Sequence, residues 1–289
     1  SSPAPSRSCR VLELGCASGG NVIPMAERLS GSQFVGIDLA PSQIAAGQRM
    51  IDELGLRNVA LRAMSLTDVD SGFGVFDYVI CHGVYSWVPL DVQEAILRVC
   101  STNLAPNGVA YVSYNTYPGW HARGMAREMM LYHDDPSLPV GDRVARARHL
   151  IETLAAAGGT PPSIHSLALA EEAGVLRSQD DAHFAHEQLE PYNFPVYFAE
   201  FARRAGLAGL RYLGEAKLAS SASHRPAWLR SIVGDDDSDI VRVQQYIDFA
   251  RGRTFRRTLL CRDALAPHPL PRADAIPRLY FTMHAVPVE

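Results

Sequence analysis

The segment from Glu13 to Gly20 holds the residues whose types and spacing point most directly to chemistry. Its glycines stand between an apolar run and a helical pattern, where a backbone without side chains can approach a ligand closely. The start of the following helix then offers free N–H groups to that ligand. The run GCASGG (Gly15–Gly20) is not the GxGxxG of a dinucleotide-binding turn. The segment therefore predicts a ligand-binding turn of another kind.

A carboxylate stands at the end of the next apolar run, at Asp38, just before the helix start Pro41-Ser42-Gln43. A carboxylate that accepts from both hydroxyls of a ribose makes charge-assisted hydrogen bonds, which an adenosine site needs. The turn and Asp38 together predict a nucleoside-containing ligand at the carboxyl edge of a parallel sheet. A Rossmann-like protein that binds a different nucleotide is the alternative.

With Glu13 before it, the turn resembles the (D/E)xGxxxG first motif of class I S-adenosylmethionine-dependent methyltransferases, and Ala17 replaces the motif's usual second glycine. The resemblance implies S-adenosylmethionine as the cofactor, S-adenosylhomocysteine as its product, and no metal. Ser65 stands where many members carry an acid that contacts adenine. The implied cofactor contacts are Glu13, Gly15, Cys16, Ala17, Gly19, Asn21, Asp38, Leu39, Gln43, Ser65, Leu66, Cys81, His82 and Gly83.

Two aromatic-rich loops, residues 81–89 and 114–121, follow later strands and supply the acceptor side. Methyl transfer from a sulfonium is an in-line displacement, so the protein must align donor and nucleophile and exclude water. An amine acceptor must arrive neutral, which requires an orienting group or a modest base. The candidate catalytic residues are Tyr85, Asn115, Tyr117 and His121, and the candidate substrate-binding aromatic residues are Tyr85, Trp87, Tyr117 and Trp120.

Each of these candidates also has a structural interpretation. Trp87 and Trp120 are equally well explained as packing anchors, and residues 117–119 as a simple turn. His82 is more often a hydrogen-bonded loop residue than a base. The pair His183 and His186 has one-face helical spacing, but the HExxH order is absent, so hydrogen bonding is favoured over metal binding.

Both loops, with the runs HEQLE (residues 186–190) and FPVYF (residues 194–198), resemble bacterial methyltransferases that carry a methyltransferase regulatory domain. That group includes rickettsial protein-lysine methyltransferases, and the resemblance spans about residues 9–261. It implies N-methylation, with a protein lysine as the first acceptor to test. A methyltransferase acting on oxygen, nitrogen or carbon of a small molecule or natural product is the second hypothesis. A non-enzymatic cofactor-binding regulatory module is the third.

Alternating short β-rich runs and helical stretches predict an α/β fold of the Rossmann-like class. The predicted parallel strands are Arg10–Leu14, Gln33–Asp38, Val59–Ala63, Phe76–Cys81 and Val109–Tyr114, and the predicted helices are Asn21–Leu29, Pro41–Leu54 and Val92–Leu104. Asp91 is the expected N-cap of the last helix. Pro106-Asn107-Gly108 is the expected turn into the fifth strand.

The second half is compatible with a separate helical domain, or with completion of a seven-stranded, mostly parallel sheet. We favour the second interpretation, with a helix at Val196–Ala205, strands at Leu210–Leu213 and Thr258–Cys261, and helical insertions at Val140–Glu190, including a helix at Arg143–Ala157, and at about 225–251. The predicted units are a cofactor-binding core (1–137), a helical regulatory region (138–190), the last strands with a second insertion (191–262) and a C-terminal extension (263–289).

The composition excludes some partners and settings. The 27 basic and 31 acidic residues give a formal charge of −4, so neither nucleic acid nor an anionic membrane is an expected partner. The five cysteines are odd in number and lack CxxC pairs, which fits a reducing cytoplasm. No apolar run is long enough for a membrane helix. Residues Ser1–Ser6 are expected to be a flexible leader, with further residues missing upstream. The acidic run 234–239 is expected to be a solvated loop and helix N-terminus rather than a metal site, and the protein is expected to be a homodimer.

Overall fold

The structure is a computed structural model that describes residues 4–216, 227–234 and 239–264. Its first half alternates strands and helices as βαβ units. The elements are β1 (Arg10–Leu14), α1 (Val22–Arg28), β2 (Gln33–Asp38), α2 (Pro41–Leu54), β3 (Val59–Ala63), β4 (Phe76–Cys81), α3 (Leu90–Thr102) and β5 (Leu104–Asn115). Short 3₁₀ turns occupy Leu66–Asp68, Ser71–Phe73 and Tyr85–Trp87.

The second half begins with helices and returns to the sheet. Its elements are α4 (Gly119–His133), α5 (Val140–Ala156), α6 (Ile164–Arg177), α7 (Asp181–Phe184), a π-helical turn (Ala185–Leu189), α8 (Phe198–Leu207), β6 (Leu210–Glu215), α9 (Ala227–Val233), α10 (Ile240–Arg251) and β7 (Phe255–Arg262). The predicted C-terminal extension lies almost wholly outside the described residues, as does most of the acidic run 234–239.

The seven strands of the described residues form one sheet in the order β3-β2-β1-β4-β5-β7-β6, which confirms the predicted fold. Neighbouring strands among β1 to β5 pair in parallel, whereas β7 is antiparallel to both β5 and β6. Chain order reverses between β1 and β4, and ligands of open α/β sheets bind at such a switch point, beyond the carboxyl ends of the strands. The glycine-rich turn follows β1, so the topology places it there.

Two local predictions around α3 are wrong. The helix begins at Leu90 after Pro89, so Asp91 lies in its first turn and is not the N-cap. Pro106 and Gly108 lie inside β5 and form no separate turn. The strand extends back to Leu104 because Leu104 pairs with Phe76, and a register shift after Phe76 absorbs the irregular residues.

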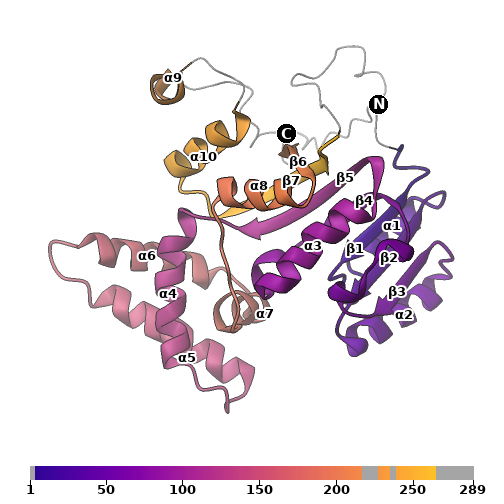
Figure 1. Ribbon diagram of the computed structural model, residues 1–289. Helices are drawn as coiled ribbons and strands as arrows, with labels where there is room; N and C mark the ends of the chain where they lie inside the picture. Colours follow the sequence, from indigo (N-terminus) through magenta and orange to yellow (C-terminus); the bar gives the residue numbers. More distant parts are fainter. Residues whose placement is uncertain (1–3, 217–226, 235–238, 265–289) are drawn as a thin grey trace, which may run out of the picture.

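Helices cover the sheet unevenly, and a helical lobe stands beside it (Figure 1). The main core includes residues of α3 and α8 packed on one face of the central strands. The lobe of α4, α5 and α6 has a separate core, in which Met130 of α4 packs with Val144 and Leu169. α4 thus shares the core of this lobe, and the predicted boundary at residue 137 falls just after it.

Buried charges fasten α10 to the last two strands. Arg256 of β7 is buried, and its guanidinium lies 2.7 Å from Asp248 of α10 and 2.5 Å from Glu215 of β6.

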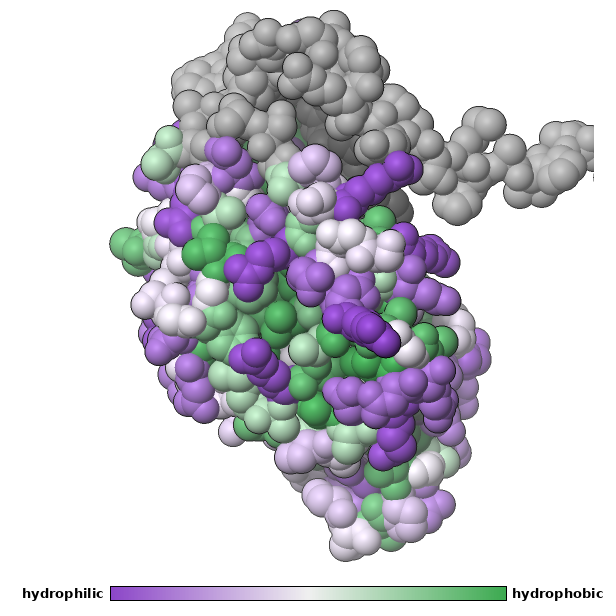
Figure 2. All heavy atoms as spheres, turned by 90° about the vertical axis from the view of Figure 1, so that its right-hand side faces the viewer, coloured by the Kyte–Doolittle hydropathy of each residue, from purple (hydrophilic) through white to green (hydrophobic). Residues whose placement is uncertain are grey.

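At the opposite end of the sheet, Figure 2 shows apolar side chains reaching the surface between polar ones on the side that carries α2. Exposed apolar side chains are ordinary on folded proteins, so this surface by itself indicates no site.

Candidate active site

The turn after β1 adopts the backbone that its glycines allow. Gly15 and Gly19 have φ values of +72° and +81°, and Ala17 also takes a positive φ of +46°. The N–H groups of Gly15 and Cys16 both donate to the carbonyl of Ile37, at 2.8 and 3.0 Å, which ties the turn to the end of β2. Residues with small side chains or none thus occupy the positions of the turn that take a positive φ.

Asp38 stands at the end of β2 and holds two backbone N–H groups. Its Oδ2 accepts from Ala17 at 2.8 Å and its Oδ1 from Ala40 at 2.9 Å. Each oxygen keeps a second lone pair, because a carboxylate has about four acceptor sites. Its half-buried carboxylate is thus fixed in place with acceptor capacity left for two hydroxyls.

Glu13 is 4 % exposed and has one oxygen without a partner. Its Oε1 accepts from Asn21 Nδ2 at 2.9 Å, whereas Oε2 has no hydrogen bond. Burial raises the pKa of Glu13, and hydrogen bonding by Asn21 and by the backbone of Val22 offsets this only in part. A buried carboxylate oxygen without a partner is costly, and a ligand cation would satisfy it. The ammonium of the methionine part of S-adenosylmethionine has that chemistry, so Glu13 and Asp38 fit the two ends of the expected cofactor.

Close packing holds the turn against its neighbours. A Cβ at Gly15 would lie 2.4 Å from Val84, and a Cβ at Gly47 of α2 would lie 2.5 Å from the carbonyl of Ser18.

Burial raises the pKa of Cys16 to about 12 and that of Cys81 well above its ordinary value. These thiols are therefore packing groups and not nucleophiles.

Several of the remaining predicted cofactor contacts follow β2 and β3. Leu39 is 75 % exposed, and Gln43 is exposed on α2. Ser65 caps the turn that Leu66 begins, and its Oγ accepts from Thr67 N–H at 3.2 Å. The hydroxyl of Ser65 is thus committed to its own turn and has limited capacity for an adenine.

The loop after β4 is anchored by Ser113, a residue of β5 that the sequence did not single out. Its Oγ lies 2.8 Å from His82 Nδ1 and accepts from Gly83 N–H at 2.8 Å. Burial lowers the pKa of His82, with a further contribution from the charge of Arg257. His82 is therefore a hydrogen-bonded loop residue, held also by the hydroxyl of Tyr111 at 3.2 Å.

The structure contradicts both predicted roles of Tyr85. Its side chain is 0 % exposed and packs in the main core, with its ring centroid 5.2 Å from that of Phe201 and 5.9 Å from that of Tyr114. Burial raises the pKa of Tyr85 to about 12. The residue faces α8 rather than the open edge, because Phe201 supplies an apolar partner from a distant segment.

Tyr117 and His121 lie together at the end of β5. Their rings stack with centroids 4.2 Å apart, and Tyr197 joins them, with its hydroxyl 3.0 Å from His121 Nε2. Burial raises the pKa of Tyr117, with a smaller contribution from Tyr197. Tyr197 belongs to the predicted motif FPVYF but was not chosen as a site residue. The three rings form a partly exposed aromatic and polar cluster.

A strap of residues 193–197 crosses this edge. Asn115 is 3 % exposed, and its Nδ2 donates to Asn193 Oδ1 at 3.0 Å. The backbone N–H of Phe194 donates to Ser86 O at 2.7 Å, and that of Val196 to Asn115 O at 3.1 Å. Asn115 therefore joins the strap to β5 and has little surface of its own.

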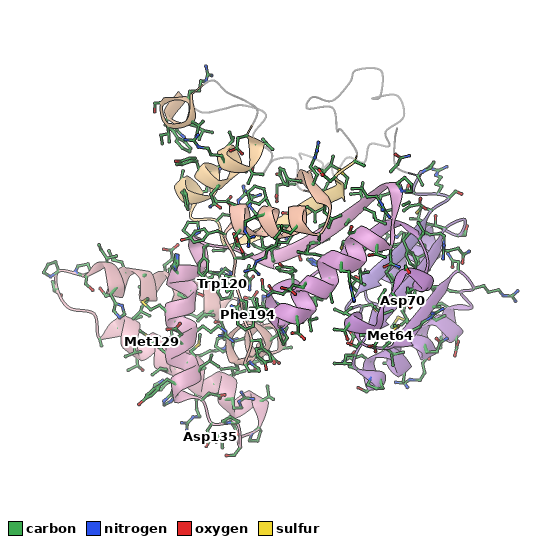
Figure 3. The ribbon with its side chains drawn as sticks, in the orientation of Figure 1. Met64, Asp70, Trp120, Met129, Asp135 and Phe194 are labelled. Carbon is green, nitrogen blue, oxygen red and sulfur yellow. The ribbon has the colours of Figure 1, made fainter. Side chains whose placement is uncertain are left out.

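Trp87 and Trp120 meet edge to face at a centroid distance of 6.3 Å, and His186 packs on Trp87 at 4.7 Å. Trp120 is only 2 % exposed, whereas Trp87 is half-buried. Figure 3 labels Trp120 and Phe194 at the junction of the sheet and the helical lobe. Burial favours the packing role for Trp120, whereas the Trp87 ring keeps part of its surface exposed.

His183 Nε2 lies 3.6 Å from Glu187 Oε2, so the partner of this imidazole is a carboxylate one helical turn away. Within the ranges that the structure describes, no group of three or more His, Cys, Asp or Glu side chains is arranged to hold a metal ion. The same ranges contain no helix with the length and apolar character needed to cross a bilayer.

Two families match this sequence. One, described as "Methyltransferase domain", matches residues 12–110, and the other, described as "Predicted methyltransferase regulatory domain", matches residues 180–262. The first covers the strands and turns of the cofactor region. The second begins at α7 and runs to the end of β7, so it contains the strap, α8, α10 and the last two strands.

Rickettsial proteins are similar over most of the chain. Uncharacterized protein RP789 of Rickettsia prowazekii is 39 % identical over 280 residues, which are 96 % of this chain and 50 % of that protein. Uncharacterized protein RP028 of the same organism is 36 % identical over 203 residues, covering 70 % of this chain and 81 % of that protein. The structure of PKMT2 from Rickettsia typhi in complex with AdoHcy matches with a TM-score of 0.84 and 36 % identity, covering 94 % of this chain and 52 % of that chain. This chain thus spans about half the length of RP789 and PKMT2.

Proposed function

This chain belongs to the S-adenosylmethionine-dependent methyltransferases that carry a methyltransferase regulatory domain, and on that premise we propose that it transfers a methyl group to an amine nitrogen. The cofactor part of the proposal is carried by the pairing of two carboxylates around one turn. Asp38 keeps free acceptor sites at the end of β2, and Glu13 has a buried oxygen without a partner.

We assign the two carboxylates to the two polar ends of the cofactor. Asp38 accepts hydrogen bonds from the ribose hydroxyls, and Glu13 pairs with the methionine ammonium. Gly15, Ala17 and Gly19 leave the backbone clear between them. When bound, the cofactor supplies an electrophilic methyl group on sulfur. The other predicted cofactor contacts, Leu39, Gln43 and Ser65 among them, belong to the same proposal.

We assign the acceptor side to Tyr117, His121 and Trp87. The stacked rings of Tyr117 and His121 border the end of β5, where a cationic amine is attracted by the faces of aromatic rings. The raised pKa of Tyr117 keeps its phenol protonated and able to donate or accept a hydrogen bond. An amine must lose a proton before attack, and His121 is the group in this cluster that takes it. Asn115 acts as a positioning residue through the strap.

A protein lysine is the acceptor that we propose to test first, supported by the resemblance to rickettsial protein-lysine methyltransferases. The decisive experiment incubates cell lysate with the enzyme and isotopically labelled S-adenosylmethionine and follows the label by mass spectrometry. Label on lysine residues supports the proposal. Label in small molecules supports methylation of a metabolite, and cofactor binding without any transfer supports a regulatory module.

Variants of Tyr117 test the acceptor side. Tyr117→Ala removes the ring, and we expect transfer to fall about tenfold, because a partly exposed cation–π contact is worth about 1–2 kcal/mol. Tyr117→Phe keeps the ring and should lose less. Cofactor affinity by calorimetry should stay near the wild-type value in both. Tyr132→Ala is the matched control, because Tyr132 is 94 % exposed on α4. Equal loss of binding and transfer would remove Tyr117 from the acceptor side.

We also propose that the protein works as a homodimer in a reducing compartment, with no nucleic acid as a partner. All five cysteines are free and buried, which supports a reducing compartment. The formal charge of −4 supports the absence of a nucleic-acid partner. Light scattering of the purified protein tests the homodimer, and a single monomeric mass would contradict it.

A further inference from the structure

A pocket with cationic walls lies between the end of β6 and the start of β7. Its volume is about 330 Å³, at the lower end of the range for small-ligand sites. Three arginines, Arg251, Arg253 and Arg257, are among the residues that line it, together with Glu215 and the turn between α10 and β7. None of these residues belongs to the cofactor or acceptor sites described above.

This pocket is joined to the acceptor edge by backbone contacts. The carbonyl of Thr254 accepts from Thr116 N–H at 2.9 Å, and that of Arg253 accepts from Gly119 N–H at 3.0 Å. The ring of Phe255 in the pocket wall lies 6.4 Å from that of His82. A ligand in the pocket would therefore lie beside the loops that follow β4 and β5.

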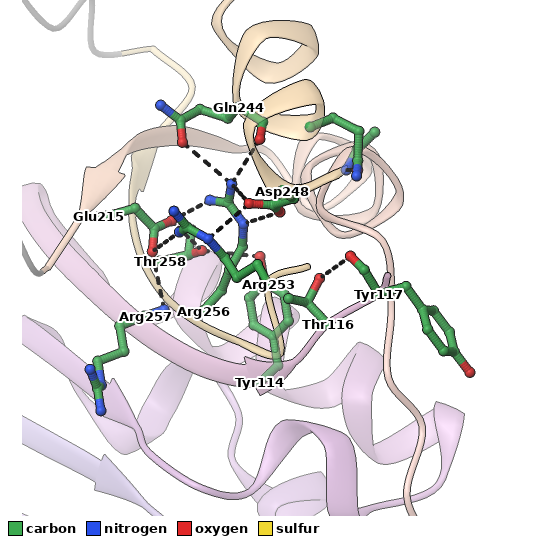
Figure 4. Close-up of polar contacts among 12 residues, drawn as sticks. Tyr114, Thr116, Tyr117, Glu215, Gln244, Asp248, Arg253, Arg256, Arg257 and Thr258 are labelled. Atoms are coloured by element: carbon green, nitrogen blue, oxygen red, sulfur yellow. Dashed lines mark hydrogen bonds and ion pairs between the residues drawn. The ribbon is translucent and has the colours of Figure 1, made fainter. Parts of the chain in front are cut away.

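Glu215 does not neutralise the pocket, because its carboxylate is turned inward (Figure 4). It is buried, and Oε1 accepts from Arg256 at 2.5 Å and from Thr258 at 3.2 Å. Its Oε2 accepts from the backbone N–H of Arg257 at 3.2 Å. The only carboxylate in the described lining is thus fully engaged by protein donors.

The buried charges behind the pocket balance one another. Arg253 lies 2.9 Å from Asp248 and 3.8 Å from Glu215, and Arg256 pairs with the same two carboxylates. Two cations therefore face two anions, and the cluster of four is formally neutral. Any net charge on the pocket must come from the other arginines.

Arg251 and Arg257 supply that net charge. Both side chains belong to exposed residues that line the pocket. Among the residues that the structure describes, no carboxylate lies within ion-pair distance of either guanidinium. The charge of Arg257 also lowers the pKa of His82, which agrees with a positive potential at this edge. Within the described ranges, the pocket thus presents two cations without an ion-pair partner.

We propose that this pocket binds an oxyanion group, a carboxylate or a phosphate, held by Arg251 and Arg257. Planar guanidinium groups match the paired oxygens of both groups. The site goes beyond the proposed methyl transfer and does not depend on it. Its place beside Thr116 and Gly119 suits the acid group of a molecule that reaches the acceptor edge.

Calorimetric titration of the full chain with inorganic phosphate, and separately with acetate, tests the site. The ionic strength is kept constant with sodium chloride, so that general screening does not change. We expect saturable binding of at least one anion, and the stronger of the two identifies the group. The double variant Arg251→Gln with Arg257→Gln should weaken binding about a hundredfold or more, because it removes two charge-assisted interactions that are each worth at least tenfold.

Arg49→Gln is the matched control, because Arg49 is an exposed arginine of α2, which packs at the opposite end of the sheet. Its anion affinity should equal that of the wild type. Melting curves check that the double variant is folded, as expected for exposed positions. Absence of saturable binding, or equal binding by the double variant, would overturn the proposal, and so would equal weakening in Arg49→Gln. The assay needs no methyl transfer, so its result stands even if the proposed function fails.

Discussion

Replacing Asp38 with alanine gives the sharpest test of the cofactor site. The variant removes both oxygens that we assign to the ribose hydroxyls. A hydrogen bond to a charged group is worth about 1.5–3 kcal/mol, so two of them give about 3 kcal/mol at the low end. That free energy corresponds to roughly a 150-fold weaker Kd. The structural loss is smaller, since the N–H groups of Ala17 and Ala40 lie near the surface and water can replace the carboxylate.

The assay is isothermal titration calorimetry with S-adenosylhomocysteine, a ligand that cannot lose a methyl group during the measurement. Asp38→Asn keeps one acceptor oxygen and should fall between wild type and Asp38→Ala. Glu53→Ala removes an exposed acid from α2 and serves as the control. A folded Asp38→Ala protein that binds within about threefold of the wild type would refute the ribose assignment, since that change is under 1 kcal/mol.

Two further predictions concern buried charge. The pKa of Glu13 is raised by burial, so its ionised form is lost as the pH falls through a value above 4.5, and cofactor affinity should decline in that window. Glu13→Gln should bind more weakly at neutral pH and lose this pH dependence in calorimetry; an unchanged profile would contradict the ammonium pairing. Arg256→Met leaves Asp248 and Glu215 buried without their main partner, and we expect unfolding by denaturant to be easier by about 3–5 kcal/mol. Arg211→Met, which breaks an exposed pair, should change it by under about 1 kcal/mol.

The cofactor half of the site could be predicted from sequence because each of its signals is local. A strand, a glycine turn and a helix start follow one another within Arg10–Arg28, and Asp38 ends the next strand. The strand bounds of β1 to β4 were predicted residue for residue. β5 was not, because its first residues are irregular and become strand only through pairing with β4.

The acceptor half was predicted less well because its geometry depends on distant segments. Tyr85 stands in an aromatic-rich loop, yet the ring of Tyr85 packs against Phe201 of α8 in the core. Tyr197 and Asn193 approach β5 from a strap far along the chain, and no local pattern assigns them partners. Ser113 lies within a continuous run of buried residues at the end of β5, so its contacts with His82 follow only from the fold.

The strap also bears on the order in which the protein folds. Its hydrogen bonds close large loops: Asn115 and Asn193 are 78 residues apart, and Thr116 and Val196 are 80 apart. The contact between Asp38 and Ala17 spans only 21 residues. Closing a longer loop costs more chain entropy, and contacts between distant residues form late. We therefore expect that, in a nascent chain, the turn after β1 and Asp38 come together before the strap closes over the end of β5.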